Sequence, residues 1–357
     1  MKEIKISNYT AICLLMILFT SENCFSGLAY PDNVWKEGRL NICVIDGGVD
    51  LSLIEESLSD TNELYKKINK DNPSLTAFND EDFQAQKMEI ISRALTPSSK
   101  FISKVDSFLR QHFNKKNTGI GLKLKSWNNC HEFKMIHSYL VLTKSDRYVG
   151  ECMGGLGVPH DGKRNLIHLE VKSAELSFQN LVKTSFPFVL IHEFGHLLGL
   201  AHELVGGHAP EDDSFYKFIE NDIDDFVFPI YDFIGQPKVY KYTEYDLHSI
   251  MSYGPGMLAT GYKDNSFTYD RSTKSIIEPF LEEAMKDSSW IYGDSVEIDL
   301  TKYLEKKNQY EILEEDQQTI KIKILPMLSD GDKHTLKCLY EYDYQNQCLD
   351  AQPLNKN

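Results

Sequence analysis

The sequence predicts an α+β or α/β fold in which a helix packs on a sheet. An apolar segment at residues 39–46 ends at the turn signal Gly47-Gly48 and is typical of a buried strand. Residues 101–113 place apolar side chains at helical spacing, which predicts a helix that faces the core. Further strands are predicted at residues 119–127, 138–143 and 165–171.

Composition restricts the class of protein. The chain has 357 residues, of which 41% are hydrophobic and 25% are charged, and these values predict a globular core of one large or two modest domains. A formal net charge of −15 repels phosphate backbones, and no basic patch offsets it, so nucleic acid is not expected as a partner. Nothing in the sequence indicates an oligomeric state.

The N-terminal segment, residues 1–26, resembles an export signal. Lys2 and Lys5 precede an apolar run from Ala11 to Phe19, and small residues allow cleavage after Ser26 or Ala29. The run is shorter than the about 20 apolar residues that a membrane span needs. We therefore expect a secreted protein, extracellular or periplasmic, without a membrane span. A buried N-terminal helix is the alternative.

Disulfides are expected in an exported chain, because they persist in oxidising compartments. After signal removal the cysteines are odd in number, so at least one thiol stays free or pairs outside the chain. Cys338 and Cys348 are predicted to pair, because residues 339–347 look mostly extended and can fold back as a hairpin.

The strongest signal lies at residues 188–202. His192 and His196 are one helical turn apart, so both imidazoles can reach one metal ion. His202 cannot reach that ion on a straight helix, since ten residues advance roughly 15 Å. The chain must therefore bend, and Gly199 permits the left-handed turn at which a helix ends.

These residue types suit a hydrolytic metal centre. Three neutral imidazoles leave a coordination position for water, and zinc lowers the pKa of that water from 15.7 towards about 7. Glu193 can take the proton as general base and pass it to a leaving amine. The short His-Glu-x-x-His match alone also fits an ordinary amphipathic helix, but Gly199 and His202 at their spacing argue against that interpretation.

The pattern from His192 to His202 resembles the metzincin signature of zinc metallopeptidases, and Glu203 after it resembles the astacin-like family, in a bacterial-type branch. Residues 245–254 resemble the astacin Met-turn. The resemblance implies that Met251 lies beneath the metal and that Tyr253 is both an additional zinc ligand and a catalytic group that stabilises the oxyanion. It also implies a metzincin fold, with a twisted, mostly parallel sheet, an active-site helix and a zinc cleft between N- and C-terminal subdomains.

The weaker resemblance extends from Val34 to Leu304. It implies that a protein or peptide substrate binds extended along an edge strand at Tyr148–Gly150, and that residues 293–304 form the final helix of the catalytic domain. The expected organisation is a signal peptide at 1–26, a catalytic domain at 27–305 with an insertion at 50–82, and a C-terminal extension at 306–357. The astacin disulfides are missing, so Cys130 and Cys152 are a candidate substitute pair.

The sequence thus predicts a secreted zinc-dependent endopeptidase. A serralysin-like protease is one alternative, because Leu200 and Ser252 fit that group, but Glu203 and the repeat-free C-terminus do not. A catalytically inactive metzincin-fold binding protein is another, and the intact Glu193 argues against it.

Overall fold

The structural statements below refer to the residues that the computed structural model describes. These are residues 27–29, 34–47, 88, 90–145, 150–153, 165–171, 176–201, 240–243, 246, 248–252, 265–273, 275–276, 304, 308–341, 343–344, 348 and 352–353. The predicted signal peptide and the predicted insertion at 50–82 lie outside these residues. No helix in the described part is both long and apolar enough to cross a bilayer.

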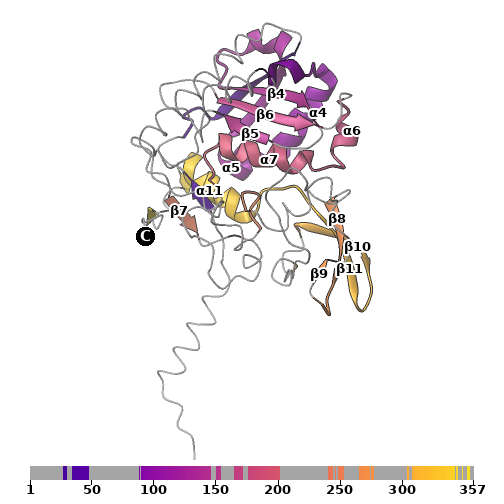
Figure 1. Ribbon diagram of the computed structural model, residues 1–357. Coiled ribbons are helices and arrows are strands. Elements are labelled where there is room, and N and C mark those ends of the chain that lie inside the picture. The colour runs from indigo at the N-terminus through magenta and orange to yellow at the C-terminus, as the bar shows by residue number, and fades with distance from the viewer. Residues whose placement is uncertain are drawn as a thin grey trace, which may run out of the picture.

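A five-stranded sheet forms the centre of the molecule (Figure 1), with the order β3-β2-β4-β6-β5. Four strands are parallel, and β5 alone runs antiparallel to its neighbour β6. The strands are β2 (Arg39–Val44), β3 (Gly121–Ser126), β4 (Ser138–Lys144), β5 (Gly150–Met153) and β6 (Asn165–Val171). The mostly parallel sheet and the strands expected at 39–46, 119–127, 138–143 and 165–171 are therefore confirmed.

Both faces of the sheet are covered, as expected for parallel strands with near-continuous apolar sequences. One face packs in a single hydrophobic cluster with the helices α4 (Ser99–His112) and α7 (Phe186–Leu197). The opposite face packs against a smaller cluster that includes Ile90 and Cys130. Ser98 caps α4 by accepting a hydrogen bond from Phe101, so the helix expected at 101–113 is confirmed. Three short helical turns are α5 (Lys115–Thr118), η2 (Trp127–Glu132) and α6 (Phe178–Leu181), and η2 contributes Cys130 to the cluster on the opposite face.

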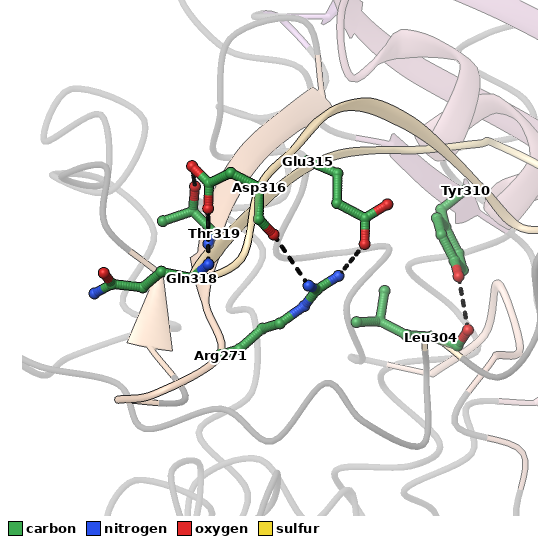
Figure 2. Close-up of polar contacts among 7 residues, drawn as sticks. All are labelled: Arg271, Leu304, Tyr310, Glu315, Asp316, Gln318 and Thr319. Carbon is green, nitrogen blue, oxygen red and sulfur yellow. Dashed lines mark hydrogen bonds and ion pairs between the residues drawn. The ribbon is translucent and has the colours of Figure 1, made fainter.

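A second, antiparallel sheet has the order β10-β11-β8-β9. Its strands are β8 (Ser266–Asp270), β9 (Ser275–Ile276), β10 (Tyr310–Glu315) and β11 (Thr319–Ile324). Figure 2 shows how the turn between β10 and β11 is held: Asp316 accepts hydrogen bonds from the backbone of Gln318 and Thr319, and Arg271 binds Glu315 and the carbonyl of Asp316. These contacts fix the end of the β10–β11 hairpin to the end of β8.

Distant parts of the chain meet in a third sheet of order β1-β7-β12. It combines β1 (Gly27–Ala29), β7 (Tyr240–Thr243) and β12 (Gln352–Pro353), all antiparallel. Helix α11 (Asp330–Tyr340) contacts α5, β1 and β7. Apolar residues of β11 and α11 belong to the same hydrophobic cluster as α7. The predicted domain boundary at 305 stays a prediction, and of the helix expected at 293–304 only Leu304 is described.

The disulfide expectations had different outcomes. Cys338 and Cys348 are bonded, as expected. The expected extended hairpin between them was partly wrong, because Cys338 and the two residues after it belong to helix α11. The pairing of Cys130 with Cys152 is wrong, because Cys130 is bonded to Cys43 with a Cα–Cα distance of 5.7 Å. Sheet order explains this outcome. Cys152 lies on β5, three strand spacings or roughly 14 Å from β2, whereas η2 follows β3 and lies beside β2.

Candidate metal centre

Helix α7 carries the predicted site and ends as its sequence requires. Pro187 lies in its first turn, where its missing N–H leaves no hydrogen bond unmade. At the other end Gly199 has a φ of +94°. The N–H groups of Gly199 and Leu200 donate to the carbonyls of His196 and Gly195 at 2.9 and 3.0 Å, which is the Schellman arrangement. The predicted bend of the chain at Gly199 is confirmed.

The two histidines of α7 are oriented by backbone carbonyls. Nδ1 of His192 lies 2.9 Å from the carbonyl oxygen of Ile250, and Nδ1 of His196 lies 2.9 Å from that of Leu200. A carbonyl oxygen only accepts hydrogen bonds, so each Nδ1 carries the ring hydrogen and each Nε2 presents a lone pair. The two Nε2 atoms face each other at 3.1 Å.

A shared metal ion would account for two lone pairs at this distance. Two Zn–N bonds of about 2.0 to 2.1 Å span such a separation at an angle of about 100°. Both rings are buried, with exposed fractions of 8% and 7%. Burial lowers the pKa of His192, and burial together with the neighbouring His192 lowers the pKa of His196 to about 3. Both imidazoles are therefore neutral near pH 7, as metal binding requires.

The other predicted site residues lie partly inside and partly outside the described chain. Glu193 is buried on α7 beside the first histidine, with 5% of its surface exposed. Ala201, at the end of this described segment, is also buried. His202 and Tyr253 lie outside the described residues. The structure thus brings together the histidine pair, while the proposed third ligand and the tyrosine remain predictions.

A turn that includes residues 248–252 lies against α7. Met251 is fully buried, and a Cβ added at Gly195 would lie only 2.7 Å from its sulfur. The glycine in α7 is therefore what allows the methionine to pack so closely. The same turn supplies the Ile250 carbonyl that orients His192.

The segment that holds these features also matches a known protein family. Residues 172–280 match the family model described as Astacin, a peptidase family. This match supports an astacin-like metallopeptidase. The matched segment contains both α7 and the turn with Met251. No curated protein and no solved structure gives a significant match to the chain.

Asp332 holds the turn at residues 248–252, a role that the sequence did not indicate. Its Oδ1 accepts a hydrogen bond from the Ser249 hydroxyl at 2.6 Å, and its Oδ2 accepts from the Ile250 N–H at 3.1 Å. The carboxylate also accepts from the N–H of Ser329, which caps α11. Burial raises the pKa of Asp332, while these donors oppose the shift. The Ser329-x-x-Asp332 spacing was a readable helix-start signal, but it does not reveal the contact with the Met-turn.

Two further side chains hold the C-terminal end of α7. The indole N–H of Trp35 donates to the Leu197 carbonyl at 2.8 Å, and the hydroxyl of Tyr340 donates to the Leu198 carbonyl at 2.8 Å. These bonds satisfy carbonyls that have no partner within a helix end. Burial raises the pKa of Tyr340, so its hydroxyl keeps the proton that it donates. An isolated bridge between Ala29 and Leu200 fixes the residue whose carbonyl orients His196.

Proposed function

We propose that the protein is a secreted zinc-dependent endopeptidase of the astacin-like, bacterial-type branch. One observation carries the proposal: the unprotonated Nε2 atoms of His192 and His196 face each other at 3.1 Å while backbone carbonyls hold both Nδ1 atoms. The family match over residues 172–280 supports the same activity.

In this proposal His192, His196 and His202 hold zinc, and Tyr253 is an additional protein ligand. Zinc bound there would polarise a scissile carbonyl and lower the pKa of a water molecule. The donor set fits, because neutral imidazoles with their other ring nitrogen bonded to a carbonyl are typical zinc ligands. The Met-turn and α11 keep the first ring in place through Ile250 and Asp332.

Glu193 is the proposed general base. It lies next to His192 in the buried part of α7, where a carboxylate within reach of a water molecule can remove its proton. The same carboxyl group then returns the proton to the leaving amine. Tyr253 is proposed to donate its hydroxyl hydrogen to the oxyanion of the transition state.

The proposed substrate is a protein or peptide segment in extended conformation, bound along the edge strand expected at Tyr148–Gly150. Of this segment Gly150 is described, as the first residue of β5, which is an edge of the central sheet and contacts α7 (Figure 1). The opposite edge differs, because the Leu124 N–H of β3 is bonded to the buried Asp106 of α4 at 2.8 Å. β5 is therefore the better candidate for backbone pairing with a substrate, which gives affinity with little sequence selectivity.

Export through a signal peptide at residues 1–26 completes the proposal. The two disulfides support it, since such bonds persist in oxidising compartments.

The test is cleavage of a generic unfolded protein by the purified full-length protein. We expect internal cleavage that a chelator removes and added zinc restores, and that Glu193→Ala abolishes without unfolding the chain. Glu132→Ala is the matched control, because Glu132 is an exposed partner of Lys125. Equal cleavage by Glu193→Ala and the wild type, or release of terminal residues only, would contradict the proposal.

A further inference from the structure

A second cluster of metal-binding residue types lies on α11. A ring nitrogen of His334 and the sulfurs of Cys338 and Cys348 all lie within 4.8 Å of one another. Among the described residues this is the one group of three such donors within that distance. The two sulfurs form a disulfide, and in that oxidised form they are not thiolates and cannot bind a metal as thiolates do.

We propose that this cluster is a redox-dependent metal site. When the disulfide is reduced, the thiolates of Cys338 and Cys348 and Nε2 of His334 bind one zinc ion or another thiophilic divalent cation. The proposal concerns a different part of the chain from the proposed catalytic site and does not rest on it.

Helix geometry places the first two donors at metal-binding distance. His334 and Cys338 are four residues apart on α11, and so they share one face of the helix. The distance from Nε2 to the Cys338 sulfur is 3.5 Å. A zinc ion with bonds of about 2.3 Å to sulfur and about 2.0 to 2.1 Å to nitrogen, at a tetrahedral angle, separates these two atoms by about 3.5 Å. The pair therefore needs little rearrangement.

Tyr344 fixes the histidine from its other side. Its hydroxyl oxygen lies 2.9 Å from Nδ1 of His334. When Nδ1 donates its hydrogen to that oxygen, Nε2 is left with a lone pair directed towards the sulfurs, as in metal sites with an outer-shell partner. Burial, and to a smaller extent the charge of Lys337, lower the pKa of His334, so the ring is neutral near pH 7.

Cys348 remains close to the cluster after reduction, because the chain is tethered on both sides of it. Before it, the N–H of Tyr344 donates to the Glu341 carbonyl at 2.9 Å. After it, Gln352 and Pro353 pair with β7. The Cα atoms of the two cysteines are 5.8 Å apart, and side-chain rotation alone can move the sulfurs to the about 3.8 Å that two Zn–S bonds require.

The chemistry balances with a dithiol as reductant. The dithiol supplies two electrons and two protons, becomes a cyclic disulfide, and leaves two protein thiols. Binding of the divalent cation then releases both thiol protons, which makes affinity rise with pH. In a reducing compartment the metal would replace the disulfide as the link between α11 and residues 341–353. The start of the same helix holds the Met-turn through Asp332.

Cobalt binding to the full-length protein tests the proposal. We expect near-ultraviolet thiolate-to-cobalt charge-transfer absorption after reduction by a dithiol, and none before it. His334→Ala should weaken cobalt binding at this site by more than about tenfold, and Tyr344→Phe by about tenfold. His131→Ala is the matched control, because it removes a histidine beside Cys130 of the other disulfide and should change nothing. Histidine ligands give no thiolate absorption, so the result is independent of the proposed catalytic site.

Alkylation of individual cysteines provides the second measurement. Zinc should slow the alkylation of Cys338 and Cys348 in the reduced protein and leave that of Cys43 and Cys130 unchanged. Three results would overturn the site: no charge-transfer absorption, the same absorption and affinity in His334→Ala as in the wild type, or equal alkylation of all four cysteines with zinc present. If reduction unfolded the chain, all four cysteines would be alkylated equally, and this result too would contradict the proposed site.

Discussion

Gly195 of α7 is a residue whose lack of a side chain lets Met251 pack closely against the candidate site. In Gly195→Ala the new Cβ would lie 2.7 Å from the sulfur of the buried Met251. We expect the crowding to destabilise the protein by about 1–3 kcal/mol, measured as a lower urea midpoint. The control is Gly121→Ala, where the nearest atom to the new Cβ is 3.9 Å away. Equal losses in the two variants would show that Met251 is not the cause.

His112 gives a pH dependence that belongs to a single side chain. Burial, with a smaller contribution from the charge of Lys333, lowers its pKa from 6.5 to about 4. Below pH 6.5 the unfolded chain therefore binds a proton that the folded chain does not, and stability falls as the pH drops towards 4. The loss amounts to about 3 kcal/mol at most.

His112→Gln removes this titration, so urea unfolding at a series of pH values should show a smaller loss of stability between pH 7 and pH 4 than in the wild type. Parallel pH curves for the two proteins would disprove the assignment.

The residues of the candidate site differ in how far the sequence could reveal them. His192, Glu193, His196 and Gly199 lie within two turns of one helix and its end, so spacing alone indicates their arrangement. Asp332 reaches Ile250 across more than 80 residues of sequence, and no local pattern encodes that contact. The Ile250 carbonyl that orients His192 is also distant in sequence, whereas the Leu200 carbonyl that orients His196 is only four residues away, at the helix end.

Helix α11 holds the turn at residues 248–252 through Asp332. Asp332→Asn keeps the size of the side chain but leaves one acceptor oxygen in place of two for three donors, the Ser249 hydroxyl and the N–H groups of Ile250 and Ser329. We expect a loss of about 2–4 kcal/mol in the free energy of unfolding, because buried donors are left without acceptors. Asp330→Asn is the matched control, because the Asp330 carboxylate lies on the surface and pairs with Lys333, and it should change stability by less than about 0.5 kcal/mol. A similar loss in both would contradict a specific role for Asp332.

Elements with strong periodicity and full burial were the ones that the sequence revealed. Strands β2, β4 and β6 and helix α4 were predicted with errors of one or two residues at their ends. The β10–β11 hairpin and α11 were missed, although Thr319–Ile324 alternates apolar and polar residues as a half-buried strand does. The sequence alone does not identify such a strand or helix, because its apolar face needs a partner that is distant in sequence. The partner of β11 is β8, and a partner of α11 is α5.

At the scale of the whole molecule the two disulfides differ in the length of chain that they close. Cys43 and Cys130 are separated by 87 residues, and Cys338 and Cys348 by 10. Loop-closure entropy predicts losses of about 4–5 and about 3 kcal/mol when each pair is replaced by alanine. Urea midpoints of the two double variants provide the test, and a larger loss for the Cys338–Cys348 pair would contradict the entropic explanation. The Cys338–Cys348 pairing could be predicted from the sequence, but the partner of Cys130 could not, because it depends on the order of strands in the sheet.

The three-stranded sheet of β1, β7 and β12 can be completed only after all three strands have been synthesised. A ribosome adds residues from the N-terminus onward, so the histidines of α7 exist long before α11 and β12. Until residues 330–353 have been synthesised, the turn at residues 248–252 lacks its hydrogen bonds to Asp332, and the end of α7 lacks its hydrogen bond from Tyr340. Strand β7 then has only one of its two neighbouring strands. A growing chain therefore carries the histidine pair without these contacts, and assembly of the candidate centre waits until residues 330–353 have been synthesised.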